Sequence, residues 1–83
     1  MKQLLTELEI TDDDYFDIGG DNMTLVKNLI GEDLYYQSRV GFELEFVNRD
    51  WNRQSQTIKI YIVGNYRDLF WFRIKYTPKL GEK

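Results

Sequence analysis

The sequence of 83 residues contains no cysteine and no histidine. Without cysteine, the chain can form neither a disulfide bond nor a thiolate metal site. Without histidine, it lacks the most common general base and the most common zinc ligand. We therefore expect no catalytic residue, no metal site and no cofactor, and we look for a function in binding.

Long hydrophobic runs are also missing. The longest apolar stretches are a handful of residues, far short of the ~20 that a membrane-spanning helix requires. An acidic residue, Glu7, precedes any hydrophobic segment, which is unlike a signal peptide. We expect a cytoplasmic protein without a membrane segment, folded as one domain over residues 1–83. Its core should be thin, because a chain this short buries only about 60–65% of its unfolded surface.

Alternating apolar and polar residues predict three strands in the C-terminal half. They cover residues 40–47, 57–62 and 70–76, each with an apolar residue at every second position. A Gly-Asn pair in the segment 64–68 is typical of a turn, and Pro78 would end the last strand because proline cannot donate a ladder hydrogen bond. The pattern predicts a three-stranded antiparallel meander.

The net charge of −3 is unevenly distributed. Residues 1–45 carry eleven acidic and three basic residues, a net charge of −8, whereas residues 46–83 carry eight basic and three acidic residues, a net charge of +5. In the predicted meander, outward acids of one strand would lie beside bases of the other two. These residues are Glu43 and Glu45 on one side and Lys59, Arg73 and Lys75 on the other. Such pairs contribute a few tenths of a kcal/mol each, so the sheet should neutralise much of the asymmetry.

Helical spacing in the N-terminal half predicts two short helices, at residues 2–9 and 22–30. The first carries three leucines at helical spacing, and the second carries an i, i+1, i+4, i+5 apolar stripe. Asp21 or Asn22 would cap the second helix and Gly31 would end it. The leucines of the first predicted helix are Leu4, Leu5 and Leu8.

A second interpretation of this half stays open. It places further strands at residues 23–29 and 34–47, joined by residues 30–33, and gives a mostly-β sheet or small barrel. The first interpretation gives an α+β fold, with one or two short N-terminal helices packed on the meander. We predict the α+β class.

The segment 12–23 contains acidic residues, the pair Tyr15-Phe16 and the sequence Ile18-Gly19-Gly20-Asp21-Asn22. It resembles the attachment-site signature of acyl and peptidyl carrier proteins, in which a serine at the position of Asn22 carries phosphopantetheine. An asparagine amide cannot form that phosphodiester, and strands from residue 40 onward do not fit a helical carrier bundle. We therefore interpret the segment as local geometry: an aromatic pair packed on the core, a Gly-Gly reversal and a capped helix. Thr11 followed by three aspartates is likewise typical of a helix N-cap.

The acidic segment is the first candidate site. It lacks the ligand spacing of a calcium-binding EF-hand loop, but closely spaced carboxylates on a rigid domain can imitate nucleic-acid phosphates. Phage-encoded inhibitors of bacterial defence enzymes, anti-CRISPR proteins among them, share this size and acidity. We expect an inhibitor or adaptor that binds a protein partner, such as a nucleic-acid-handling enzyme or CRISPR effector. The predicted contact residues are Asp12, Asp13, Asp14, Tyr15, Asp17 and Asp21.

Two alternatives remain. Bases interleaved with aromatics are typical of surfaces that bind single-stranded nucleic acid, although the acidic net charge disfavours direct nucleic-acid binding. A sheet with aromatic residues on both faces also favours a homodimer or larger homo-oligomer, in which a second copy buries the free face. The residues of the nucleic-acid hypothesis are Arg49, Trp51, Arg53, Tyr61, Trp71, Arg73 and Lys75.

Overall fold

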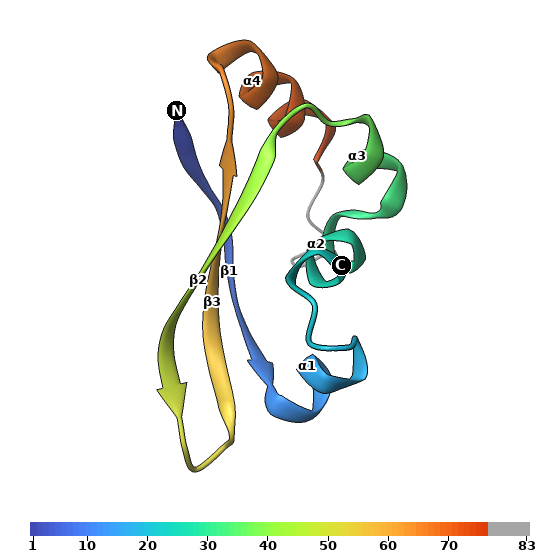
Figure 1. The fold of residues 1–83 in the computed structure, drawn as a ribbon. Helices are drawn as coiled ribbons and strands as arrows, with labels where there is room; N and C mark the ends of the chain where they lie inside the picture. Colours follow the sequence, from blue (N-terminus) through green and yellow to red (C-terminus); the bar gives the residue numbers. More distant parts are fainter. Residues whose placement is uncertain (77–83) are drawn as a thin grey trace, which may run out of the picture.

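Residues 1–76, which the computed structural model describes, form a three-stranded antiparallel sheet with four short helices on one side of it (Figure 1). The predicted α+β class is confirmed, and the mostly-β alternative is wrong. The sheet order is β1-β3-β2, so β3 is the central strand. The strands are β1 (Lys2–Thr11), β2 (Gly41–Asp50) and β3 (Ser55–Val63), and the helices are α1 (Asp12–Asp17), α2 (Asn22–Ile30), α3 (Glu32–Gln37) and α4 (Tyr66–Lys75).

The core lies between the helices and the inner face of β3. In the second half of this strand, every second residue is an isoleucine that is 0% exposed, as the alternation predicts for a half-buried strand. Leu25 and Val26 of α2 pack on one end of the strand, and Leu69 and Phe72 of α4 pack on the other. Leu5 of β1 touches both groups and joins them into one core. The buried isoleucines are Ile58, Ile60 and Ile62.

The predicted helix at residues 2–9 is wrong, because this segment is the edge strand β1. Its register with β3 shifts between Leu4 and Thr6, which marks a β-bulge. The bulge lets Leu5 face the core together with Leu8, three residues later, although a regular strand would put them on opposite faces. The bulge therefore gives the leucines of β1 a spacing that is typical of a helix.

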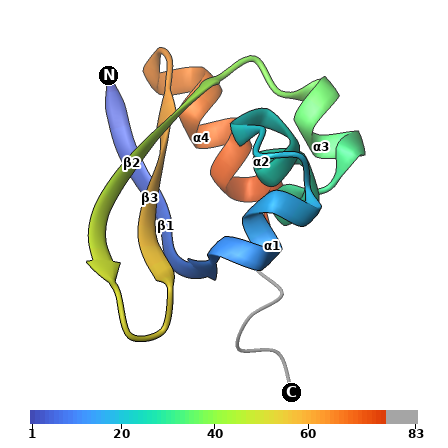
Figure 2. The same cartoon turned by 60° about the horizontal axis from the view of Figure 1, so that its bottom comes forward.

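The predicted third strand at residues 70–76 is also wrong, because α4 occupies this segment. Asn65 caps the helix by accepting a hydrogen bond from the backbone N–H of Asp68. Leu69 and Phe72, three residues apart, face the core, whereas the alternation predicted that Phe70 and Phe72 share a face. The predicted meander is therefore wrong: the two predicted strands β2 and β3 form a hairpin, and β1 pairs with the other edge of β3, which lies in the middle of the sheet (Figure 2). Pro78 lies outside the described residues.

The helix predicted at residues 22–30 is confirmed as α2. Asp21 is its N-cap, and Gly31 follows it with a φ of +93°, a conformation that favours glycine. The strand proposed in the second interpretation at residues 23–29 is absent, because α2 occupies that segment. The strand proposed at residues 34–47 forms only from Gly41 onward, as part of β2, because α3 occupies its start. Thr11 caps α1 as its sequence indicates.

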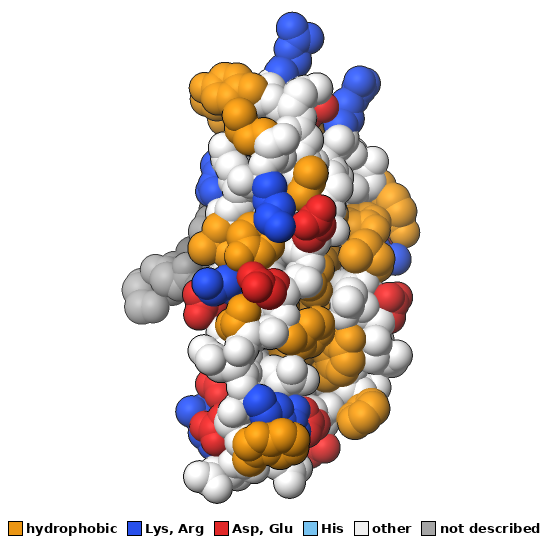
Figure 3. Space-filling view, turned by 60° about the vertical axis from the view of Figure 1, so that its left-hand side comes forward, with side chains coloured by type: hydrophobic (Ala, Val, Ile, Leu, Met, Phe, Trp, Pro, Cys, Tyr) orange, Lys and Arg blue, Asp and Glu red, His pale blue; other side chains and the backbone are white. Residues whose placement is uncertain are grey.

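Acidic and basic side chains alternate across the strands on the sheet face that no helix covers. Lys59 of β3 is in register with Glu7 of β1 and with Glu45 of β2, so one base lies between two acids. Lys2 Nζ lies 3.2 Å from Glu43 Oε1 on the same face. Figure 3 shows acidic and basic side chains beside each other along this part of the surface. The predicted position of Lys59 beside Glu45 is confirmed, and Glu43 pairs with Lys2 of β1. The prediction is wrong for Arg73 and Lys75, which belong to α4 and not to the sheet.

Candidate functional site

The acidic segment forms α1 and lies where β1 leaves the sheet (Figure 1). The Thr11 side chain accepts a hydrogen bond from the backbone N–H of Asp14 at 3.2 Å, which satisfies one free donor of the first turn. The three aspartates in that turn stabilise the helix, because their negative charges lie at the positive end of the helix dipole. The local sequence therefore accounts for a helix that presents carboxylates.

Asp12 is engaged within the protein. Its carboxylate accepts two hydrogen bonds from the guanidinium of Arg49, at 2.7 and 2.6 Å. These bonds lower the pKa of Asp12 below its ordinary value and raise the pKa of Arg49. The guanidinium also lies over the Trp51 ring, 4.6 Å from the ring centroid. This contact ties α1 to the end of β2, so Asp12 holds the site in place and is not a free contact residue.

Asp21 and Tyr15 are engaged as well. Asp21 accepts hydrogen bonds from the Thr24 hydroxyl and the Met23 backbone N–H, and these bonds lower its pKa. The Tyr15 hydroxyl donates to the Asn22 side-chain oxygen at 2.7 Å. Both residues therefore fix the turn between α1 and α2, and Asn22, where a carrier protein would have serine, serves as a hydrogen-bond acceptor.

The aromatic pair of this segment divides between core and surface. The Tyr15 ring meets the Phe46 ring edge-on, with centroids 6.1 Å apart, and is half-buried. Phe16 is 74% exposed, so the prediction that both rings pack on the core is wrong for Phe16. Gly19 and Gly20 have φ values of +85° and +65° and form the predicted reversal.

The remaining residues form what we call the α1 acidic surface. It consists of Asp13, Asp14 and Asp17, all exposed, together with Phe16. Among residues 1–76, no ion pair engages these three carboxylates. Three of the six predicted contact residues are therefore available to a partner. Phe16 joins them, because it flanks the acidic residues in sequence and is exposed.

The seven residues of the nucleic-acid hypothesis do not form one surface. Arg49 lies near the end of β2 and is paired with Asp12, and Trp51 and Arg53 lie in the turn between β2 and β3. Tyr61 lies on the open sheet face and donates a hydrogen bond to Glu45 at 3.0 Å. The three others are on α4: Trp71, Arg73 and Lys75.

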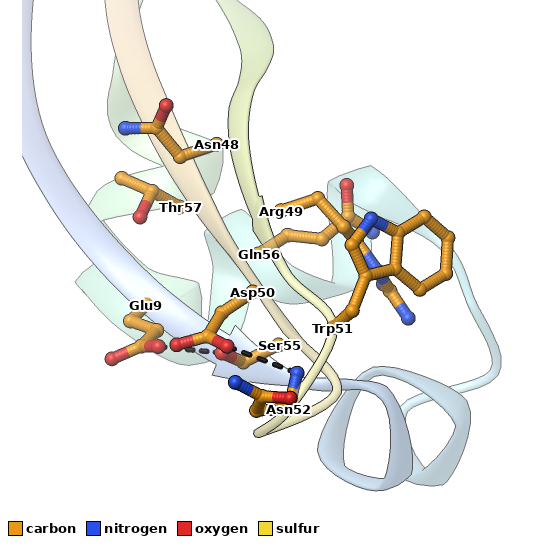
Figure 4. Close-up of a pocket in the computed structure, with 9 residues that line it drawn as sticks. All are labelled: Glu9, Asn48, Arg49, Asp50, Trp51, Asn52, Ser55, Gln56 and Thr57. Atoms are coloured by element: carbon orange, nitrogen blue, oxygen red, sulfur yellow. Dashed lines mark hydrogen bonds between the residues drawn. The ribbon is translucent and has the colours of Figure 1, made fainter.

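An open hollow of about 550 Å³ lies beside the β2–β3 turn (Figure 4). Its wall holds a contact between serine and carboxylate: the Ser55 hydroxyl donates to Glu9 Oε2 at 2.5 Å, and Glu9 Oε1 lies 3.2 Å from Arg53. A serine nucleophile must be reachable by its substrate, and Ser55 is only 1% exposed. The contact therefore stabilises the turn, together with Asp50, which accepts hydrogen bonds from the backbone N–H groups of residues 52 and 53.

No family model, no curated protein and no solved structure matches this chain. Among residues 1–76, no helix has the length and apolar character needed to cross a bilayer. The chemistry of the exposed side chains is therefore the basis for a function.

Proposed function

We propose that the protein is a small binding module, an inhibitor or adaptor, that engages a basic surface of a protein partner through the α1 acidic surface. The observation that supports this proposal is the position of Phe16. It is 74% exposed, and exposed carboxylates of the same helix surround it in sequence. An exposed aromatic ring is a typical interface anchor, and the carboxylates determine which partners it can meet.

Partners that bind nucleic acid fit this chemistry. Their grooves present arginine and lysine side chains to phosphates, and carboxylates can accept the same charge-assisted hydrogen bonds. Long-range attraction between opposite charges also accelerates association. We therefore infer that the α1 acidic surface competes with nucleic acid for a basic groove of its partner.

A phosphate mimic must hold its carboxylates in place, because ordering them on binding would weaken the complex. The bidentate contact between Arg49 and Asp12 fixes the start of α1 to β2. The hydrogen bond between Tyr15 and Asn22 fixes its end to α2. These contacts support a preorganised helix although α1 has only six residues.

Two matched charge reversals test the proposal. Asp13→Lys with Asp14→Lys changes two exposed first-turn residues of α1, and Glu32→Lys with Asp33→Lys changes two exposed first-turn residues of α3, which also has six residues. Both variants change the net charge equally and oppose a helix dipole in the same way. We expect only the α1 variant to lose partners that wild-type protein captures from a bacterial lysate.

Purified partner then tests the mechanism. Added single-stranded or duplex DNA should displace the wild-type protein from that partner, and binding should weaken with salt because the contacts are charged. Equal capture by the α1 and α3 variants, or a captured partner that DNA does not displace, would refute the phosphate-mimic function.

A further inference from the structure

Helix α4 is apolar on two separate sides. Leu69 and Phe72 face the core and are 1% and 0% exposed. Tyr66, Phe70 and Ile74 face outward and are 67%, 57% and 62% exposed. A helix at the surface of a domain normally has one apolar side, so the second apolar side has no role in the packing of α4 on the sheet.

The outward residues form a continuous ridge. Their spacing of four residues aligns them along the helix, and the rings of Tyr66 and Phe70 stack with centroids 6.3 Å apart. Rows with this spacing are the ridges that fit between the side chains of a neighbouring helix. We call Tyr66, Phe70 and Ile74 the α4 ridge.

The start of β1 lies beside α4. The Gly64 backbone N–H, just before α4, donates to the Met1 carbonyl oxygen at 3.0 Å. Arg73 Nη2 donates to the Leu4 carbonyl oxygen at 2.7 Å. Met1 and Leu4 are 65% and 43% exposed beside these contacts. Leu4 is in register with Tyr61 and so faces the open side of the sheet, whereas the α4 ridge itself places three exposed apolar side chains in one row, more than the single exposed side chains that are common on monomers.

Positive charges flank the ridge. Successive helical residues are about 100° apart, so Arg73 lies on one side of the ridge and Arg67 on the other. Lys75 follows at the end of the helix and lies over the Trp71 ring, 6.0 Å from its centroid. The acidic residue of α4 is Asp68 in its first turn, so bases outnumber acids on this helix.

We propose that the α4 ridge is a docking surface for an acidic amphipathic helix of another protein. The ridge supplies the apolar contact, and Arg67 and Arg73 select for acidic residues beside the partner's apolar stripe. A symmetric contact with a second copy fits less well, because it would gather the bases of both copies around one interface. This surface is distinct from the α1 acidic surface and does not depend on the proposed function.

The test uses a labelled synthetic peptide of about 18 residues, long enough to form a helix, with leucine along one side and glutamate elsewhere. The control peptide has lysine in place of glutamate. We expect wild-type protein to bind the glutamate peptide about tenfold or more tightly than the lysine peptide in a fluorescence anisotropy titration, which is a difference of ~1.4 kcal/mol.

Two variants test the contact itself. Phe70→Ser with Ile74→Ser should weaken binding of the glutamate peptide about tenfold or more, with the circular dichroism spectrum unchanged because both side chains are exposed. Trp51→Ser removes an aromatic side chain that is 76% exposed, at the other end of the sheet, and should leave binding unchanged. Asp13→Lys with Asp14→Lys should also leave it unchanged, which separates this proposal from the function of the α1 acidic surface.

Three outcomes would overturn the proposal. The first is equal or absent binding of the two peptides. The second is a dimer in sedimentation velocity that Phe70→Ser dissociates, which would assign the ridge to a second copy. The third is binding to phosphatidylserine vesicles without binding to the glutamate peptide, which would assign the ridge and its bases to an anionic lipid surface.

Discussion

Replacing Phe72 by alanine tests whether residues 66–75 form the helix α4. Phe72 is 0% exposed, and its ring lies 5.7 Å from that of Phe42 and 5.9 Å from that of Tyr76, centroid to centroid. Phe70 and Ile74, two residues away on either side, are more than half exposed. In a strand, all three side chains would share one face and contribute similarly. In the helix, only Phe72 contributes to the core.

The expected magnitude is large. Truncation of a buried phenylalanine to alanine costs about 3–5 kcal/mol, whereas exposed substitutions usually stay within about 0.5 kcal/mol. At roughly 0.05–0.15 kcal/mol per residue, the whole chain has a free energy of unfolding of about 4–12 kcal/mol. Phe72→Ala therefore removes much of the stability. Phe72→Leu, which keeps most of the volume, should cost less than about 1.5 kcal/mol and lower Tm by up to about 12 °C.

Urea unfolding followed by far-ultraviolet circular dichroism measures these differences. Phe70→Ala and Ile74→Ala are the matched controls, because they change similar side chains on the same helix. We expect the urea midpoint to fall for Phe72→Leu and Phe72→Ala and to stay within error for both controls, with unchanged slopes for Phe72→Leu and the controls. A loss for Phe70→Ala as large as that for Phe72→Ala would refute the helix and restore the strand.

Two further predictions concern α1 and α2. Asp12→Asn should make the free energy of unfolding less dependent on pH in the acid range. Arg49 lowers the folded-state pKa of Asp12, so the stability that this carboxylate contributes is complete above its unfolded pKa of about 3.9. That stability is lost as pH falls through the folded-state pKa. The prediction is contradicted when the urea midpoint of Asp12→Asn falls between pH 7 and pH 3 as much as that of the wild type. Gly31→Ala should cost about 1–2 kcal/mol, because the φ of +93° strains any side chain and no atom lies within 4 Å to compensate. Thermal unfolding checks this against Gly41→Ala, where φ is not positive.

The parts of the fold that sequence predicts are those with a regular period and a local end signal. In β3, three isoleucines alternate with polar residues, and the strand is central, so its pattern is not interrupted. In α2, the apolar stripe lies between a capping aspartate and a glycine with positive φ. Local sequence contains both signals in full.

The two errors arise from tertiary features that local sequence does not contain. The bulge between Leu4 and Thr6 places Leu5 on the inner face and changes a period of two into apparent helical spacing. In α4, the outward apolar residues fill the positions between the buried ones, so Phe70, Phe72 and Ile74 alternate like a strand. The alternation pattern assumes that apolar residues lie inside the protein. Because the α4 ridge is apolar and exposed, the pattern predicted a strand where a helix forms.

The sequence indicates which segment carries the exposed acidic residues, but not which of these residues are free to contact a partner. Asp12 belongs to the acidic run, yet its partner Arg49 is 37 positions away in sequence, and only folding brings them together. The capping role of Asp21 was visible in the sequence and already reduced its availability to a partner. Exposure of Phe16 depends on Tyr15 taking the contact with Phe46, which the sequence of α1 does not determine.

Folding brings part of the opposite charge of the two halves of the sequence together. Lys59 lies between acids of both neighbouring strands, and Asp12 is paired with Arg49. The carboxylates of α1 and the bases of α4 remain, each beside exposed apolar side chains. Helix α1 follows Thr11, the last residue of β1. Helix α4 follows the end of β3, where Val63 pairs with Lys2, the first residue of β1. The two helices are therefore separated by the length of the ten-residue strand β1, roughly 30 Å. That distance exceeds the Debye length of about 8 Å at physiological ionic strength, so charge reversal at one end should leave binding at the other unchanged.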